Sequence, residues 1–371
     1  MSELFIGLMS GTSMDGVDGV LADFSQGRMR VLQHCSAPLP AALQSELLAL
    51  NTPADNELHR AALAGNGLAR VYAEVVANLL RDGDTPKSAV RAIGAHGQTV
   101  RHRPQEFDGT GYTLQLNQPA LLAELCGIDV VADFRSRDVA AGGQGAPLVP
   151  PFHQAFFGQD GCAMAVLNIG GISNITVLDH SADAPVQGFD CGPGNALMDG
   201  WCQTHIGQAF DDAGSWAAGG QVHAALLASL LNEPFFAKPP PKSTGRDLFN
   251  AAWLARCLSK VTGVSPQDVQ ATLTELTARS CAEALRKVAP HCKTLVVCGG
   301  GAFNTHLMQR LAHHLPGCAV ESSEAQGLPP LQVEASAFAW LARQTCLRQT
   351  ASLQKVTGAL GARILGAIYP A

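Results

Sequence analysis

Short apolar runs separated by small polar turns form two similar series along the chain. In the first half, runs at residues 4–9, 17–21 and 29–35 have the length and composition of β-strands. In the second half, residues 164–178 again contain two apolar runs, joined by a turn of glycine and serine. Because the same strand–turn–strand unit heads each half, the pattern predicts an internal structural duplication.

Longer stretches with apolar residues at helical spacing alternate with further short apolar runs. We predict helices at residues 41–50, 57–80, 119–126, 221–231, 249–261, 266–288, 305–315 and 334–346, and one that begins at residue 196. We predict further strands at residues 91–97, 112–116, 128–132 and 294–298. Strands that alternate with helices indicate an α/β fold, and 371 residues are enough for two domains.

Three glycine-rich turns each follow an apolar strand, at residues 10–16, 170–174 and 299–304. Glycine allows a ligand to approach the backbone closely, and free N–H groups beside hydroxyls suit phosphate oxygens. Each turn alone is as typical of a hairpin or of tight packing. The three together, with a helix after the third, predict a nucleotide held between two domains. The first turn is not a Walker loop, because the Gly-Lys-Ser/Thr ending and the following helix are missing.

Two carboxylates are candidates for acid–base chemistry. Asp190 stands at the head of the turn Phe189-Asp-Cys-Gly-Pro-Gly-Asn195, where a rigid backbone would hold a general base. The alternative is that Asp190 caps the helix that begins at residue 196, although Asn195 is better placed for that. Glu334 begins the helix 334–346, where it would either orient a nucleophile or favour the helix N-terminus electrostatically.

Several other polar groups are candidates for substrate contacts. His96 and Gln98, together with Arg135 and Asp138, could bind sugar hydroxyl or carboxylate groups, although an isolated histidine is more often structural. The segment Lys242-Ser-Thr-Gly-Arg246 would either touch a phosphate or end a helix.

Composition and charge exclude several classes of protein. Hydrophobic residues are 47% and charged residues 15% of the chain, which predicts a large core rather than disorder. A net charge of −6 without a long basic run argues against nucleic-acid and membrane partners. The 11 scattered cysteines show neither a disulfide framework nor zinc-site spacing, and they fit a reducing cytoplasm. We expect neither a signal peptide nor a membrane span, because the apolar runs are too short.

Two segments bear on the domain boundaries. Residues 134–147 are rich in glycine and alanine and carry several charges. We interpret them as a loop that crosses between domains with its polar groups toward a cleft; a plain flexible linker is the alternative. The small residues of the tail, 357–368, are predicted to pack back on the first domain. The expected first domain is therefore 1–135 plus 355–371, and the second is 136–354.

Taken in order, the motifs resemble those of the anhydro-N-acetylmuramic acid kinases. The resemblance extends from residue 6 to the C-terminal tail without large gaps. Its motifs are Gly7-Leu-Met-Ser-Gly-Thr-Ser-Met-Asp-Gly-Val-Asp18, Ala95-His-Gly-Gln-Thr99, Asp133-Phe-Arg135, Ala141-Gly-Gly-Gln-Gly-Ala-Pro147, Asn168-Ile-Gly-Gly-Ile-Ser-Asn174, Phe189-Asp-Cys-Gly-Pro-Gly-Asn195 and Lys242-Ser-Thr-Gly-Arg246.

The resemblance implies a two-domain sugar kinase and actin-like (ribonuclease H-like) fold with ATP in the interdomain cleft. The family opens the 1,6-anhydro bond of its sugar with water and phosphorylates O6, giving N-acetylmuramic acid 6-phosphate and ADP in peptidoglycan recycling. By this resemblance Asp190 is the base that activates water, and Glu334 matches a second carboxylate near that water. Gly7 stands where the wider superfamily often has an aspartate. Asp15 and Asp18 are then candidates for Mg²⁺, and we assign no metal ligand.

The residue patterns and the resemblance together give the remaining candidate site residues and partners. His96, Gln98, Arg135 and Asp138 are candidate sugar contacts. ATP, arriving with Mg²⁺, would contact Gly11, Thr12, Ser13, Met14, Asp15, Gly16, Val17, Asp18, Gly19, Gly170, Gly171, Ser173, Gly299, Gly300, Gly301 and Asn304. The apolar helices of the second half leave room for a homodimer. The alternatives are an ordinary sugar or carboxylate kinase without ring opening, and a nucleotide-dependent ATPase or regulator.

Overall fold

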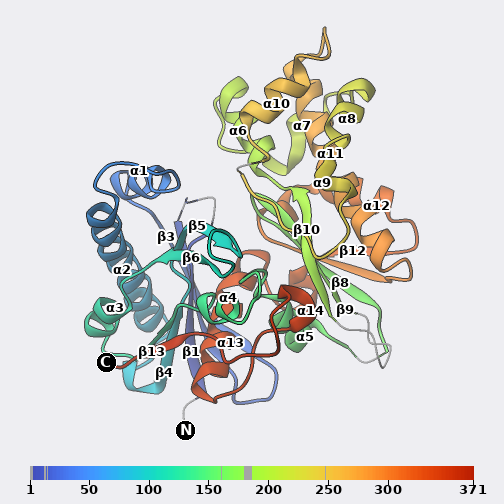
Figure 1. Ribbon diagram of the computed structural model, residues 1–371. Coiled ribbons are helices and arrows are strands. Elements are labelled where there is room, and N and C mark those ends of the chain that lie inside the picture. The colour runs from blue at the N-terminus through green and yellow to red at the C-terminus, as the bar shows by residue number, and fades with distance from the viewer. Residues whose placement is uncertain (1–2, 12–13, 15, 160, 179–185, 247) are drawn as a thin grey trace. The chain divides into compact units, whose positions relative to one another are not determined.

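Two compact units make up the chain in the computed structural model (Figure 1). Unit 1 comprises Met1–Phe156 and Leu331–Ala371, and unit 2 comprises Phe157–Pro330. The structure describes residues 3–11, 14, 16–159, 161–178, 186–246 and 248–371. The second unit is therefore inserted into the sequence of the first.

Unit 1 is built on a six-stranded sheet with the order β13-β7-β4-β1-β2-β3. The first three strands form the predicted antiparallel meander, and β4 and β7 extend it in parallel with β1. The strands are β1 Leu4–Met9, β2 Gly16–Asp23, β3 Arg30–Pro38, β4 Val90–Ala95, β7 Val130–Ala132 and β13 Ala367–Tyr369, with a separate hairpin of β5 Gln98–Pro104 and β6 Gly111–Leu116. The helices are α1 Ala41–Ala49, α2 Glu57–Asp82, α3 Pro119–Cys126, α4 Ser136–Ala140, α5 Pro150–Phe157, α13 Val333–Cys346 and α14 Gln354–Thr357.

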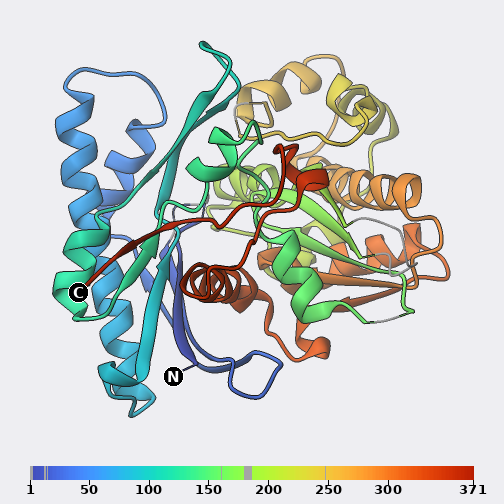
Figure 2. The ribbon, with the colours of Figure 1, turned by 60° about the horizontal axis from the view of Figure 1, so that its bottom comes forward.

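Helices cover both faces of this sheet (Figure 2). Helix α2 packs against β2 and β3, where Gly19 leaves room for Val75. On the other face, the backbone of α13 lies directly on β1 and β4. A Cβ atom on Gly7 would lie 1.9 Å from the carbonyl oxygen of Ala335, and one on Gly94 would lie 2.1 Å from that of Phe338. Only glycine permits this approach, so the superfamily's aspartate has no room at position 7.

Unit 2 repeats the strand order of unit 1. Its sheet has the order β10-β9-β8-β11-β12, with an antiparallel β8–β9–β10 meander and β11 and β12 parallel to β8. This corresponds strand for strand to β3-β2-β1-β4-β7, which confirms the predicted duplication and the two-domain sugar kinase and actin-like fold class. The strands are β8 Met164–Ile169, β9 Ile172–Leu178, β10 Gln187–Pro193, β11 Thr294–Cys298 and β12 Ala319–Ser322.

The long helix α11 packs against β9 and β10 in the core of unit 2. The other helices of eight or more residues are α6 Ala196–Ile206, α8 Ala224–Leu231, α10 Ala251–Leu258 and α12 Thr305–His314, with α11 at Pro266–Val288. The shorter ones are α7 Ser215–Ala218 and α9 Pro234–Ala237. In the part of the chain that the structure describes, no helix is both long and apolar enough to cross a membrane.

The domain boundaries of the structure differ from those expected from the sequence. Residues 134–147 do not cross between the units: they contain α4 and lie wholly within unit 1. Helix α13 also belongs to unit 1, because Gly7 and Gly94 admit its backbone, whereas the sequence pattern placed it in a second domain of 136–354. The prediction for the tail is confirmed, since β13 pairs with β7 in unit 1.

Candidate active site

The turn between β1 and β2 is anchored by buried polar groups of unit 1. The Ser10 hydroxyl donates to Gln98 Oε1, and Gln98 Nε2 donates to the Gly11 carbonyl oxygen at 3.1 Å. Farther along, Gln44 Nε2 donates to the carbonyl oxygen of Met14 at 2.8 Å. Thr12, Ser13 and Asp15 of the expected ATP segment lie outside the described residues. Gln98 is fully buried, so its side chain holds this turn in place.

The second half of the expected ATP segment lies on strand β2. Val17 is buried in the core under α2, and Gly19 packs on the same helix. Gly16 pairs with Pro38 of β3. Asp18 Oδ1 accepts a hydrogen bond of 2.5 Å from the Ser36 hydroxyl and lies 3.6 Å from His34 Nε2. The residues of this segment that lie on β2 therefore all have partners within unit 1.

His96, Arg135 and Glu334 come together in unit 1, although they lie far apart in the sequence. Arg135 Nη2 donates to His96 Nε2 at 2.9 Å, and Nη1 donates to the carbonyl oxygen of Gly145 at 2.8 Å. Burial and the Arg135 charge lower the pKa of His96 to about 3, so the ring is neutral and accepts from Arg135. Burial lowers the pKa of Arg135 to about 10, while the negative charges of Glu334 and Asp138 act in the opposite direction.

Asp138 organises the loop around this cluster. Its Oδ2 accepts from the Gly145 backbone N–H at 2.8 Å, and its Oδ1 accepts from the Thr357 hydroxyl at 2.8 Å. The side chain is fully buried. Asp138 therefore ties the loop of residues 142–145 to the C-terminal tail and has a positioning role. Direct contact of Asp138, His96 and Gln98 with the sugar stays a prediction.

In unit 2, one glycine turn bonds to the backbone at Gly194 and Asn195, and a second lies near the Asn195 side chain. The carbonyl oxygen of Gly170 accepts from Asn195 N–H at 2.7 Å, and that of Gly171 accepts from Gly194 N–H at 3.0 Å. The Asn195 amide group donates to the Ile169 carbonyl oxygen at 3.1 Å and lies 3.3 Å from where a Cβ on Gly300 would be. The structure thus brings together the turns at 170–171 and 299–300, as the nucleotide hypothesis requires.

The remaining predicted nucleotide residues of unit 2 are used within the fold. The buried Ser173 hydroxyl donates to the Pro193 carbonyl oxygen at 3.3 Å. Asn304 Oδ1 accepts from Leu307 N–H at 2.9 Å and caps α12. A Cβ on Gly301 would lie 2.4 Å from Ile169 Cγ2. Asn195, expected to cap α6, bonds to Ile169 instead, and its side chain makes no cap.

Asp190 lies on the edge strand β10 rather than at the head of a turn. The ladder between β10 and β9 shifts register between Asp190 and Gly192, which is a β-bulge. The backbone N–H of Asp190 donates to the Lys242 carbonyl oxygen at 3.1 Å, and Asp190 Oδ2 accepts from Thr244 N–H at 2.9 Å. The segment 242–244 therefore runs along β10 and fixes this carboxylate.

The surroundings of Asp190 favour its protonated form. Burial raises the pKa of the carboxyl group to about 7, and the Thr244 hydrogen bond and the Lys242 charge oppose that shift only in part. A carboxyl group with a pKa near the working pH can accept a proton from a reacting water efficiently.

The turns fit a nucleotide better than they fit a metal held by the protein. Above Gly170 the nearest atom to a Cβ position is the Ile172 carbonyl oxygen at 3.8 Å, so a phosphate can approach this backbone. Among the described residues, no three His, Cys, Asp or Glu side chains cluster to hold a metal ion. Asp18, one Mg²⁺ candidate, is already bonded to Ser36.

Comparison with known proteins decides the family. A model of the anhydro-N-acetylmuramic acid kinase family matches residues 3–371. The chain belongs to this family. Proteins named anhydro-N-acetylmuramic acid kinase from Variovorax paradoxus and Albidiferax ferrireducens are each 67% identical to it; the alignments cover all of this chain and 99% and 100% of those proteins. The protein of the same name from Cupriavidus metallidurans is 57% identical to this chain, and the alignment covers all of this chain and 98% of that protein.

The solved structures that resemble this chain are less similar to it in sequence than these relatives are. An activator of 2-hydroxyisocaproyl-CoA dehydratase from Clostridium difficile with bound ADPNP is 10% identical, covers 94% of this chain and 99% of its own, and has a TM-score of 0.48. A glucokinase from Streptomyces griseus with glucose and AMPPNP is 15% identical, covers 92% and 99%, and has a TM-score of 0.41. Because these TM-scores are below 0.5, we infer nothing about the site of this protein from either structure.

The segment 242–246 matters more to the site than its sequence indicated. Sequence reasoning left it between a phosphate contact and the end of a helix. In the structure its backbone holds Asp190, while Lys242 Nζ donates to the Phe235 carbonyl oxygen at 3.3 Å in α9. Arg246 reaches the Gly171 turn, with its guanidinium 3.2 Å from where a Cβ on Gly171 would be. Thr244 was missed because its backbone, which carries no residue-specific signal, makes the contact.

Proposed function

We propose that this kinase uses ATP to convert anhydro-N-acetylmuramic acid into N-acetylmuramic acid 6-phosphate and ADP, opening the 1,6-anhydro ring with water. The single observation that carries the proposal is the carboxyl group of Asp190, whose raised pKa suits a general base. The family membership of the chain supplies the sugar and the phosphoryl transfer. The product would feed amino sugar catabolism during peptidoglycan recycling in the cytoplasm, and the homodimer stays a prediction.

The proposed reaction forms one bond to C1 and one bond to the γ-phosphorus. Asp190 takes a proton from water while the water oxygen bonds to C1 of the sugar. The C1–O6 bond breaks, and O6 takes the γ-phosphoryl group as the bond to the β-phosphate oxygen of ATP breaks. Mg²⁺, when bound with ATP, would neutralise charge on the phosphate oxygens. In unit 2, the glycine turn at 170–171 would hold those oxygens through backbone N–H groups.

We further propose that the unit 1 cluster serves the water side of the reaction. Arg135 is held by His96 and by the Gly145 carbonyl oxygen, and its charge attracts Glu334 at the start of α13. A guanidinium fixed in this way would keep the Glu334 carboxylate oriented toward a polar ligand. Glu334 would then serve as the second carboxylate that the family resemblance implies, while Asp138 keeps the surrounding loop in shape.

Isotope labelling separates this reaction from that of an ordinary kinase. With ATP and the anhydro sugar in ¹⁸O-water, we expect one labelled oxygen at C1 and none in the phosphate ester, because O6 comes from the sugar itself. Mass spectrometry of the product and its fragments measures both positions. A phosphorylated product that keeps its anhydro ring, or that has no label at C1, would contradict ring opening. ATP hydrolysis that does not depend on the sugar would favour the ATPase alternative.

The turnover number should rise with pH through about pH 7 and then level. Asp190 must be deprotonated to accept a proton, and burial raises its pKa to about 7. Below that value the protonated fraction grows and kcat falls, approaching a tenfold loss for each further pH unit. Initial rates at saturating ATP and sugar between pH 5.5 and 8.5 give the profile. A flat profile across that range would show that another group accepts the proton.

A further inference from the structure

The side chain of Arg246 carries a positive charge that unit 2 does not use. Within the part of the chain that the structure describes, its guanidinium group neither pairs with a carboxylate nor donates a hydrogen bond. The side chain is exposed, so its packing does not account for it. Its five N–H donors are therefore available to a ligand.

The guanidinium group of Arg246 lies over the glycine turn that joins β8 to β9. Its Nη2 and Nε atoms are 3.2 Å and 3.3 Å from where a Cβ on Gly171 would be. The φ angle of Gly171 is outside the left-handed region, so its backbone conformation does not require glycine. A side chain at position 171 would instead press on the guanidinium group. At Gly170, the nearest atom to a Cβ position is 3.8 Å away, so the turn beside Arg246 is open to a ligand.

Hydrogen bonds fix the backbone on both sides of this guanidinium group. Two residues earlier, Thr244 N–H donates to Asp190 Oδ2 at 2.9 Å. The carbonyl oxygen of Arg246 itself accepts from the Asn250 amide group at 3.2 Å. The fold therefore sets the point from which the Arg246 side chain extends to the turn.

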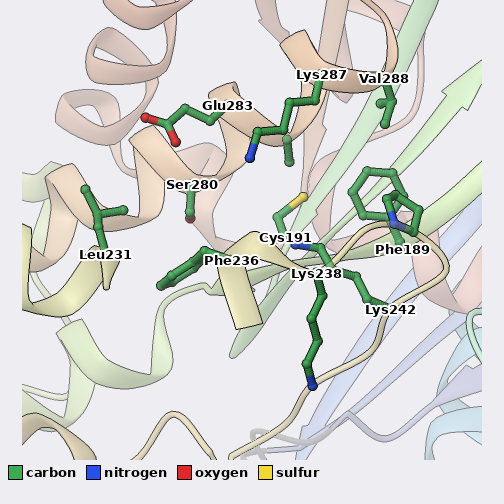
Figure 3. Close-up of a pocket in the computed structure, with 12 residues that line it drawn as sticks. Phe189, Cys191, Leu231, Phe236, Lys238, Lys242, Ser280, Glu283, Lys287 and Val288 are labelled. Carbon is green, nitrogen blue, oxygen red and sulfur yellow. The ribbon is translucent and has the colours of Figure 1, made fainter. Parts of the chain in front are cut away.

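Lys242, the other basic residue of the segment 242–246, is used elsewhere. Its Nζ donates to the Phe235 carbonyl oxygen at 3.3 Å and lies 4.5 Å from the centre of the Phe235 ring. Lys242 lines the pocket shown in Figure 3, as does Phe236. Of the two basic residues, Arg246 is therefore the one at the glycine turn.

We propose that Arg246 binds the terminal phosphate of ATP, together with the backbone N–H groups of the turn at 170–171. Arginine presents a planar fork of donors that matches phosphate oxygens, and it stays charged at neutral pH. The terminal phosphate is favoured over the inner two because Arg246 follows Thr244, the partner of Asp190, by a span of at most about 7 Å. This role rests on the proposed function, in which the sugar attacked beside Asp190 receives that phosphate.

Calorimetric titration of the full chain with two nucleotides tests this contact. The first is a non-hydrolysable ATP analogue with an imido group between the β- and γ-phosphates, and the second is ADP; both are used with Mg²⁺ and without the sugar. Arg246→Gln should weaken binding of the analogue about tenfold, because one charge-assisted contact is lost. The affinity for ADP, which has no terminal phosphate, should change by less than about twofold.

Two further variants control for charge and for folding. Arg256→Gln removes an exposed arginine of α10 and should bind both nucleotides like the parent protein. Arg246→Lys keeps the charge without the fork of donors, so its affinity for the analogue should lie between those of the parent protein and Arg246→Gln. Since Arg246 is exposed, all three variants should unfold at the temperature of the parent protein.

Unchanged affinity of Arg246→Gln for the analogue would overturn the contact. Equal losses for the analogue and ADP would overturn its assignment to the terminal phosphate, and an Arg246→Lys variant that binds no better than Arg246→Gln would show that the charge is not what the analogue meets. Binding is measured without the sugar, so none of these results depends on Asp190 or on ring opening. Failure of the parent protein to bind the analogue would instead contradict ATP use itself.

Discussion

Replacing Asp190 with asparagine should lower kcat by about a thousandfold, within the range found for removal of a general base. Asparagine keeps the size of the side chain and can still accept the Thr244 N–H bond that holds Asp190 Oδ2 at 2.9 Å. It cannot accept a proton from water at neutral pH. Steady-state rates with ATP and the anhydro sugar give the effect, and calorimetry should show unchanged ATP affinity.

The same variant should be more stable than the parent protein at pH 8. The pKa of Asp190 is raised to about 7 in the folded protein, so this carboxyl group binds its proton more tightly there than in the unfolded chain. Its favourable contribution to folding is present below the unfolded pKa and is lost as the pH rises through the folded pKa. Asparagine avoids that loss, and we expect a gain of about 1 to 2 kcal/mol in the free energy of unfolding at pH 8.

Asp212→Asn provides the control for both measurements. Asp212 is an exposed carboxylate of unit 2, so this change should alter neither kcat nor stability appreciably. Near-normal turnover of Asp190→Asn would show that the base lies elsewhere. Lost turnover with lost stability would indicate a structural role for Asp190 instead.

Replacing Gly7 with alanine should destabilise the protein by about 3 kcal/mol or more, because the new methyl group has no space. Its carbon would lie 1.9 Å from the Ala335 carbonyl oxygen and 2.6 Å from the Ala339 backbone nitrogen. These are backbone atoms of α13, so relief requires the whole helix to move away from β1. Urea unfolding followed by circular dichroism measures the loss.

Gly200→Ala is the matched control for the Gly7 variant. Gly200 is an exposed residue of α6 with no atom within 4 Å of a Cβ position, so alanine there should be neutral or stabilising by up to about 1 kcal/mol. Stability of Gly7→Ala equal to that of the parent protein would mean that α13 does not rest on β1. Because α13 carries Glu334, the Gly7 variant should also lose activity at temperatures where it remains folded.

The first meander and the pair β8–β9 could be predicted because each combines short apolar strands with glycine turns at close range in the sequence. Strand β10 could not. Its sequence, Gln187-Gly-Phe-Asp-Cys-Gly-Pro193, contains two glycines and a proline, which are rare inside strands. An edge position and a bulge accommodate them here, and neither feature has a local sequence signal.

The prediction of the domain boundaries was wrong for a different reason. The apolar pattern of residues 334–346 correctly predicted a helix, but a helical pattern does not say which sheet the helix will cover. That information lies about 330 residues away at Gly7 and again at Gly94, where the absence of a side chain admits the helix backbone. Candidate site residues were found by type, whereas partners that act through their backbone, such as Thr244 for Asp190, left no trace in the sequence.

The insertion of unit 2 within unit 1 determines the order in which the chain can be completed during synthesis. Residues 157–330 leave the ribosome as one continuous stretch and contain every strand of their own sheet. Unit 1 begins to emerge first, yet the face with Gly7 and Gly94 stays uncovered until residues 333–346 follow, and strand β7 lacks its neighbour β13 until residue 369. Unit 1 is therefore completed after unit 2, because it needs residues from both sides of the inserted stretch.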